Sequence, residues 1–243
     1  MPIDLQSGPP IPDAATGGTG FPEATASFLG QYRRPTALPS KMCGLTQRTE
    51  DGSHPRWYPD ASMETRVCPW WYAYSFDNPL RRLLHPPARL LSGWVRPGMT
   101  VLDVGCGIGH FSLGMARLVG PGGRVIAADH QEKALAVVAR RARRAGLADR
   151  ITVRRCEKDS CGVAGPVNFA LAFWMLHETP SAEALCRQIA GALSPGGRFL
   201  VVEPAFHVGQ ADFDAELAAA VRAGLRLIER PRVKISRAAL FGL

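Results

Sequence analysis

The sequence predicts an α/β fold with a mainly parallel β-sheet covered by helices on both faces. From about residue 99 onward, short apolar runs alternate with amphipathic segments. Strands that alternate with helices are typical of parallel sheets with right-handed crossovers. Two glycine turns, Pro121-Gly122-Gly123 and Pro195-Gly196-Gly197, each lead directly into an apolar run and are interpreted as helix-to-strand connections. Ligands of such folds bind at the carboxyl ends of the strands.

The individual elements follow from the hydrophobic pattern. Strands are expected at residues 100–104, 124–129, 151–155, 167–173 and 198–202, with two final strands near 225–230 and 236–241. Helices are expected at residues 110–119, 131–145, 181–193 and 210–223. A further helix is expected near residues 78–91, where Pro86-Pro87 should break or kink it, because proline lacks the N–H that a helix interior needs.

The N-terminal part of the chain differs in composition from the rest. Nine of the 20 prolines lie in residues 1–60, which we expect to be a proline- and glycine-rich tail or a loosely draped arm. Residues 61–98 are expected to form an aromatic helical lid segment, which contains Trp70-Trp71-Tyr72. Residues 99–243 are expected to be the main folded domain.

Charge and cysteine content limit the class of protein. The whole chain has a net charge of +8, and residues 61–243, with 24 basic and 15 acidic side chains, carry +9 of it against −1 for residues 1–60. Six irregularly spaced cysteines without a C-x-x-C pair indicate a reduced, cytoplasmic setting rather than a disulfide scaffold. Ligand spacings typical of a metal site are absent from the sequence, and so is an apolar run of the ~20 residues that a membrane span requires.

The most informative motif connects the first predicted strand to the following helix. An acidic residue near the strand end, Asp103, precedes three alternating glycines, Gly105, Gly107 and Gly109. Such a loop allows a ligand to lie directly against the backbone. A dinucleotide-binding loop of the G-x-G-x-x-G type would need its third glycine at His110, so the motif argues against a dehydrogenase.

With these features the chain resembles the class I S-adenosylmethionine-dependent methyltransferases, in particular small-molecule members of the ubiquinone and menaquinone biosynthesis type. The resemblance extends from about Trp70 to the C-terminus. It rests on the glycine loop, on Asp129 at the end of the second strand, and on the turn at residues 193–197 before a strand that ends in Glu203-Pro204. It implies a Rossmann-like, seven-stranded, mainly parallel sheet whose last strand is antiparallel, and S-adenosyl-L-methionine as the cofactor of residues 99–243.

The resemblance also implies roles for individual residues. The glycine loop would pack against the methionine part of the cofactor, and Asp103 would hold its amino end. Asp129 would accept hydrogen bonds from both ribose hydroxyls. Glu157 would meet the adenine amino group, although Asp159 could serve instead. The implied cofactor contacts, taken together, are Asp103, Gly105, Cys106, Gly107, Gly109, Asp129, His130, Glu157, Tyr72 and Phe173. The alternative is that the acids only cap helices, and small size alone would explain Cys106.

The acceptor side is expected in the segment after the fourth strand. Trp174 would form an aromatic wall, and His177 could take a proton near neutral pH. Alternatively, His177 only orients the turn. The aromatic residues around Tyr72 would cover the cofactor as a lid or simply pack against the domain.

We therefore predict a methyltransferase that acts on a small-molecule acceptor. An RNA methyltransferase is one alternative, but the arginines of residues 140–144 are expected to face solvent beside an apolar stripe. Arsenite or thiol methylation is a second alternative, through Cys68, Cys156 and Cys161, although the segment after the fourth strand lacks the cysteine of that group. A non-catalytic domain that binds the cofactor is a third.

Overall fold

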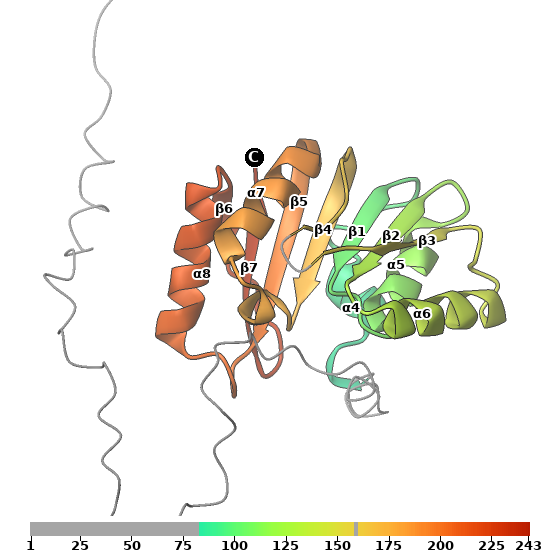
Figure 1. The fold of residues 1–243 in the computed structure, drawn as a ribbon, viewed down its shortest axis with the longest axis horizontal. Helices are drawn as coiled ribbons and strands as arrows, with labels where there is room; N and C mark the ends of the chain where they lie inside the picture. Colours follow the sequence, from blue (N-terminus) through green and yellow to red (C-terminus); the bar gives the residue numbers. More distant parts are fainter. Residues whose placement is uncertain (1–82, 158–159) are drawn as a thin grey trace, which may run out of the picture. The chain divides into compact units, whose positions relative to one another are not determined.

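The computed structural model describes residues 83–157 and 160–243, which form a sheet with helices on both faces (Figure 1). Within these residues the sheet has seven strands in the order β3-β2-β1-β4-β5-β7-β6. The strands are β1 (Thr100–Val104), β2 (Arg124–Asp129), β3 (Ile151–Arg155), β4 (Val167–Phe173), β5 (Leu193–Pro204), β6 (Arg226–Glu229) and β7 (Ser236–Gly242). The helices are α4 (Pro87–Leu91), α5 (His110–Val119), α6 (Glu132–Arg144), the 3-10 turn η1 (Leu176–Glu178), α7 (Ala182–Ala192) and α8 (Gln210–Arg222).

The strand directions confirm the predicted sheet. β1 to β5 pair in parallel, and β7 lies antiparallel between β5 and β6. The carboxyl ends of β1, β2, β4 and β5 therefore meet at one edge of the sheet. Because β7 runs in the opposite direction, its first residue, Ser236, pairs with Pro204 at that same edge.

Two hydrophobic cores lie on opposite faces of the sheet, since neighbouring residues of one strand point to opposite sides. Val101 of β1 packs in the core that includes α4, α5 and α6. The next residue, Leu102, packs in the core that includes α7 and α8. Each face of the sheet is thus covered by its own helices. The polar side chains Asp103, Asp129 and Glu203 lie near the carboxyl ends of the strands.

The break predicted at Pro86-Pro87 is confirmed: Leu83 and Leu84 are helical, Pro86 is extended, and α4 begins at Pro87. One strand differs in extent from the sequence prediction. The strand expected at 198–202 begins at Leu193 instead, because Leu193 already pairs with Val167 of β4. The predicted turn at 195–197 therefore lies inside β5 as an irregularity, with Gly196 at φ +76°.

Helix α6 confirms the predicted apolar stripe but corrects the prediction for one arginine. Ala134, Leu135, Val137, Val138 and Ala142 are all buried. Arg141 was expected to face solvent with its neighbours, but it is half-buried and donates a hydrogen bond of 2.7 Å to the carbonyl of Ile108. This side chain thus braces the glycine loop. No helix in the described part of the chain is both long and apolar enough to cross a bilayer.

Close packing of α5 against α4 depends on Gly114. A Cβ at this position would lie 2.2 Å from Cβ and 2.7 Å from Cγ of Pro87, whose ring cannot move aside. We expect Gly114→Ala to lower the free energy of unfolding by about 1–3 kcal/mol. Gly191→Ala is the matched control, because a Cβ there meets nothing within 4 Å. The control should be neutral or stabilising by up to about 1 kcal/mol in urea titrations, and equal losses in both variants would contradict this packing argument.

Candidate functional site

The loop between β1 and α5 has a backbone that only glycine adopts readily. Gly105, Gly107 and Gly109 have φ values of +63°, +52° and +84°. A Cβ on Gly105 would also come within 2.9 Å of the Met175 side chain, which lies against the loop. The loop therefore presents bare backbone at the carboxyl edge of the sheet.

Asp103 lies beneath this loop, as the fourth residue of β1. Its side chain is 2% exposed and accepts a hydrogen bond of 2.5 Å from the hydroxyl of Ser112 on α5. The strand end, the loop and the following helix are thus joined around a buried carboxylate.

Asp129, the last residue of β2, connects two loops. Its Oδ2 atom accepts the N–H of Gly107 at 2.8 Å, and its Oδ1 atom accepts the N–H of Gln131 at the same distance. The side chain is only 4% exposed. His130 follows directly, with Nδ1 3.6 Å from Asp129 Oδ1. The fold therefore brings together the glycine loop and the acid at the end of the second strand.

The residues expected around adenine have fewer contacts with the glycine loop and Asp129 than the residues described above. Cys156 donates its backbone N–H to the carbonyl of Asp129 at 3.1 Å, so the chain leaves β3 beside that residue. Glu157 is exposed and forms an isolated bridge with Ser160. Its alternative, Asp159, lies outside the described residues, as do Tyr72 and the other aromatic residues before position 83.

Aromatic side chains follow β4. Phe173 is buried, with its ring 4.3 Å from that of Phe111. Trp174 has φ +59°, which is unusual for a bulky residue, and its indole N–H donates to the hydroxyl of Ser236 at 3.0 Å. The ring of Trp174 also lies 5.5 Å from that of Phe206. The hydrogen bond to Ser236 thus holds this strained tryptophan at the carboxyl edge of the sheet.

The carboxylate of Glu203 holds the ring of His177 in position. The sequence alone did not indicate this partner. The Nδ1 atom of His177 lies 2.5 Å from Oε2 of Glu203, which is fully buried at the end of β5. The other oxygen of Glu203 accepts the N–H of Leu176 at 2.8 Å. Because a carboxylate only accepts hydrogen bonds, Nδ1 carries the proton and Nε2 is the titrating atom.

The surroundings of His177 favour its charged form. Burial alone would lower the pKa of His177, but the hydrogen bond and charge of Glu203 outweigh burial. The charges of Glu178 and Glu216 act in the same direction, so the pKa is raised above its usual value. The histidine thus binds a proton more readily than a free imidazole does.

A second buried acid, Glu216 on α8, lies close enough to influence this pair. Burial, followed by the charge of Glu203, raises the pKa of Glu216 to about 8. Within the described residues its Oε2 atom has no hydrogen-bond partner. Glu216 is therefore largely protonated near neutral pH.

This shift predicts a pH dependence of stability. An unfolded Glu216 ionises near pH 4.5 and the folded one near 8, so its contribution is complete below 4.5 and is lost as the pH rises to 8. Glu216→Gln should match the parent at pH 4.5 and exceed its free energy of unfolding by about 1–3 kcal/mol at pH 8.5. Exposed Glu229→Gln is the control in the same urea titrations. A parallel pH profile for Glu216→Gln and the parent would contradict the shifted pKa.

Cys106 and Cys156 are not activated thiols. Burial and the charges of Asp103 and Asp129 raise the pKa of Cys106 well above its usual value. Burial and the charge of Asp129 raise the pKa of Cys156 to about 12. Cys161 is buried, and Cys68 lies outside the described residues. A thiolate-based acceptor site gains no support from these residues, because reactivity needs a lowered thiol pKa.

Comparisons with known proteins agree with this architecture. Residues 96–233 match the model of a family described as a methyltransferase domain, which is more than half of the chain. The chain therefore belongs to this methyltransferase-domain family, and its Rossmann-like fold is that of S-adenosylmethionine-dependent methyltransferases. A solved S-adenosylmethionine-dependent methyltransferase from Aquifex aeolicus superposes with a TM-score of 0.65 at 21% identity, over 72% of this chain and 98% of that one.

Two curated relatives have names that refer to ubiquinone. A ubiquinone biosynthesis O-methyltransferase of Xanthomonas axonopodis is 32% identical over 133 residues, which is 54% of each chain. A ubiquinone/menaquinone biosynthesis C-methyltransferase of Pseudomonas entomophila is 37% identical over 117 residues, or 46% of this chain and 44% of the relative. The chain thus spans about half the length of the curated relatives it matches.

Proposed function

We propose that this chain transfers a methyl group from S-adenosyl-L-methionine to a small-molecule acceptor, and that the cofactor binds at the Gly105–Gly109 loop between Asp103 and Asp129. The observation that carries the proposal is the position of Asp129. This buried carboxylate is hydrogen-bonded to the loop itself, through Gly107.

The residues at this edge fit such a cofactor. Each oxygen of Asp129 accepts one backbone N–H, which leaves lone pairs for the two ribose hydroxyls. The positive φ angles of Gly105 and Gly107 leave the backbone open to close approach. Met175, which touches Gly105, borders the same region. When bound, the cofactor supplies a methyl group already activated by its positive sulfonium, and the two buried acids favour that charge.

The acceptor is proposed to lie beside Trp174 and His177. Methyl transfer requires alignment of the acceptor atom and exclusion of water more than it requires acid-base chemistry. The ring of Trp174, held by its hydrogen bond to Ser236, would align the acceptor. The names of the relatives support a small organic acceptor, and because one name refers to oxygen and the other to carbon, they support the class of acceptor rather than one atom.

His177 is proposed to accept a proton at Nε2 from a weakly acidic acceptor, with Glu203 holding the ring in position. His177→Ala should lower kcat at least about 10²-fold at pH 7. The parent should lose activity below the raised pKa of His177, and this acid limb should disappear in the variant. A wild-type pH–rate profile in His177→Ala would instead assign the histidine to orienting the turn.

The direct test of the function is transfer of labelled methyl groups. The protein is incubated with methyl-labelled donor and a small-molecule extract, or with total RNA in a parallel reaction. We expect label in the small-molecule fraction, and none when Asp129→Ala replaces the parent. Label in RNA alone would favour the RNA alternative, and no transfer to either pool would contradict the proposed activity.

A further inference from the structure

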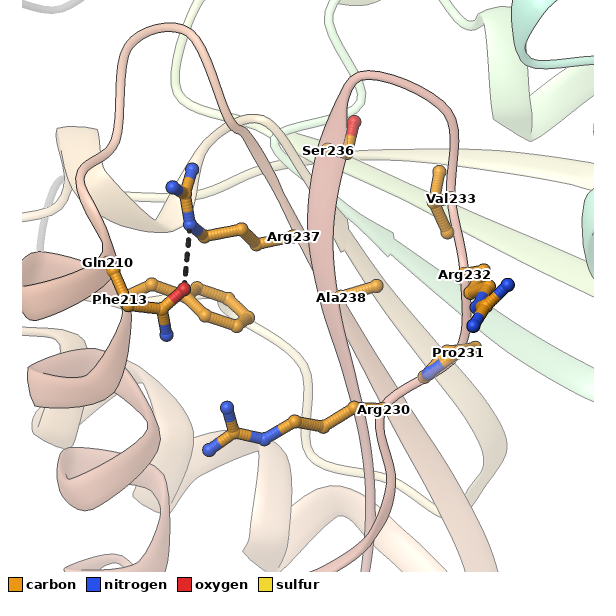
Figure 2. A pocket seen from close by; sticks show the side chains of 9 residues that line it. All are labelled: Gln210, Phe213, Arg230, Pro231, Arg232, Val233, Ser236, Arg237 and Ala238. Atoms are coloured by element: carbon orange, nitrogen blue, oxygen red, sulfur yellow. Dashed lines mark hydrogen bonds between the residues drawn. The ribbon is translucent and has the colours of Figure 1, made fainter.

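A pocket of about 420 Å³ opens between the start of α8 and the loop that joins β6 to β7. Figure 2 shows its side chains: Arg230 and Arg237 extend toward Gln210 and Phe213 of α8, whereas Arg232 and Val233 lie on the other side of β7. The lining residues are Gln210, Phe213, Arg230, Pro231, Arg232, Val233, Ser236, Arg237 and Ala238. Three of these are arginines, and none is acidic.

Arg237 gives the pocket a fixed positive charge. Its Nε atom donates to Oε1 of Gln210 at 3.1 Å, as the dashed line in Figure 2 marks. Its Nη1 atom donates to the carbonyls of Ala205 at 2.9 Å and Val208 at 2.7 Å. All three acceptors are neutral, so these hydrogen bonds orient the guanidinium without forming an ion pair. A half-buried charge of this kind favours an anionic partner.

The other two arginines add to this charge. Arg230 has only a weak ion pair, 3.5 Å from Oδ1 of Asp214, and that oxygen also accepts from Gln210 at 3.0 Å. Arg232 is exposed and makes no hydrogen bond or ion pair with any described residue. The Arg230 side chain can therefore turn to a ligand on the α8 side of β7 without breaking a strong interaction.

The remaining wall of the pocket is apolar. Phe213, Val233 and Ala238 are buried, and Pro231 borders the opening. A volume of this size is typical of sites for small molecules. The combination predicts a ligand with an anionic group and an apolar body, rather than an inorganic ion alone.

The pocket also lies near the proposed acceptor region. Its residue Ser236 accepts the hydrogen bond from the indole of Trp174. Ser236 pairs with Pro204, one residue after the Glu203 that holds His177. A ligand here would therefore lie at the same edge of the sheet as the residues that follow β4.

We propose that this pocket binds a small organic anion, a carboxylate or a phosphate monoester attached to an apolar group. Arg237 supplies a preoriented guanidinium, and Arg230, which extends toward α8 on the same side of β7, contacts the anionic group (Figure 2). Phe213 of α8 contacts the apolar body. This binding does not depend on methyl transfer, so it can be measured in the absence of any methyl donor.

The test is calorimetric titration of the full chain with benzoate, phenyl phosphate and neutral benzamide at fixed ionic strength. We expect at least one of the two anions to bind, and benzamide to bind at least 10-fold more weakly. The carboxylate and phosphate arms identify which anion the pocket prefers. Failure of both anions to bind at millimolar concentration, or equal binding of benzamide, would overturn the proposal.

Variants distinguish the pocket from the general positive charge of the chain. Arg230→Gln and Arg237→Gln should each weaken binding about 10-fold or more, as expected for charge-assisted hydrogen bonds. Arg226→Gln is the matched control, because this exposed arginine of β6 removes the same charge but does not line the pocket. The exposed Arg230 can be replaced with loss of only its weak ion pair with Asp214. An equal loss in Arg226→Gln and Arg230→Gln would contradict a specific site.

Discussion

Asp129→Ala should weaken the binding of S-adenosylhomocysteine at least about 100-fold, which corresponds to about 2.7 kcal/mol. Hydrogen bonds to a charged group each contribute about 1.5–3 kcal/mol, and this carboxylate is proposed to accept two from the ribose. It also holds the loop through the N–H of Gly107. The substitution therefore removes direct contacts and the tie that positions the loop.

Isothermal titration calorimetry measures this effect, with thermal unfolding as the check on folding. Asp149→Ala is the matched control, because the same carboxylate is removed from a side chain that is 66% exposed. The control should bind as the parent does. Affinity of Asp129→Ala within about threefold of the parent, which is about 0.7 kcal/mol, would contradict the ribose assignment.

Glu203→Ala should lower the free energy of unfolding by about 3–5 kcal/mol. Glu203 is fully buried, and its two oxygens hold the N–H of Leu176 and the ring of His177. Without the carboxylate, a buried donor is left unsatisfied and a cavity opens beside the end of β5. Urea titration at pH 7 measures the loss, and a change below about 1 kcal/mol would show that the contacts of Glu203 do not stabilise this edge.

Glu203→Gln keeps the shape of the side chain and tests its charge. The pKa of His177 should fall in this variant, as followed by NMR titration of the imidazole, because the main group that raises it is neutralised. Stability from a raised histidine pKa is complete below the unfolded value near 6.5 and is lost as pH rises through the folded pKa. This pH dependence should flatten in the variant. Glu178→Gln, 3.9 Å from Nε2, should have a smaller effect, and an unchanged pKa in Glu203→Gln would contradict the pairing.

Most of the fold could be predicted from the sequence because buried strands leave a simple signal. The strands β1 to β4 have the bounds that the apolar runs predicted, each beside glycine, proline or a charged residue. The start of β5 could not be predicted, since Leu193 joins the sheet by pairing with Val167 despite the proline and glycines that follow. Pairing between strands is a tertiary interaction, and it outweighs local turn preference.

The candidate site was predictable in part. The loop glycines could be recognised because their spacing reflects a backbone requirement, and the resemblance pointed to Asp103 and Asp129, which the fold places beside that loop. The partnership of His177 with Glu203 could not, because it depends on β4 and β5 ending side by side, with both side chains on one face of the sheet. The position of Glu203 at the end of an apolar strand was the one feature of the sequence that could have indicated a role for this acid. The arginine pocket was missed for the same reason, since α8 and the β6–β7 loop come together only in the folded chain.

The central claim is that the loop between β1 and α5 holds the methyl donor. Its most direct test is a crystal structure of the full chain grown with saturating S-adenosylhomocysteine. The account predicts density for the nucleoside against Gly105–Gly109, with both ribose hydroxyls within hydrogen-bond distance of Asp129. An empty loop under those conditions, or the nucleoside bound elsewhere on the chain, would contradict it.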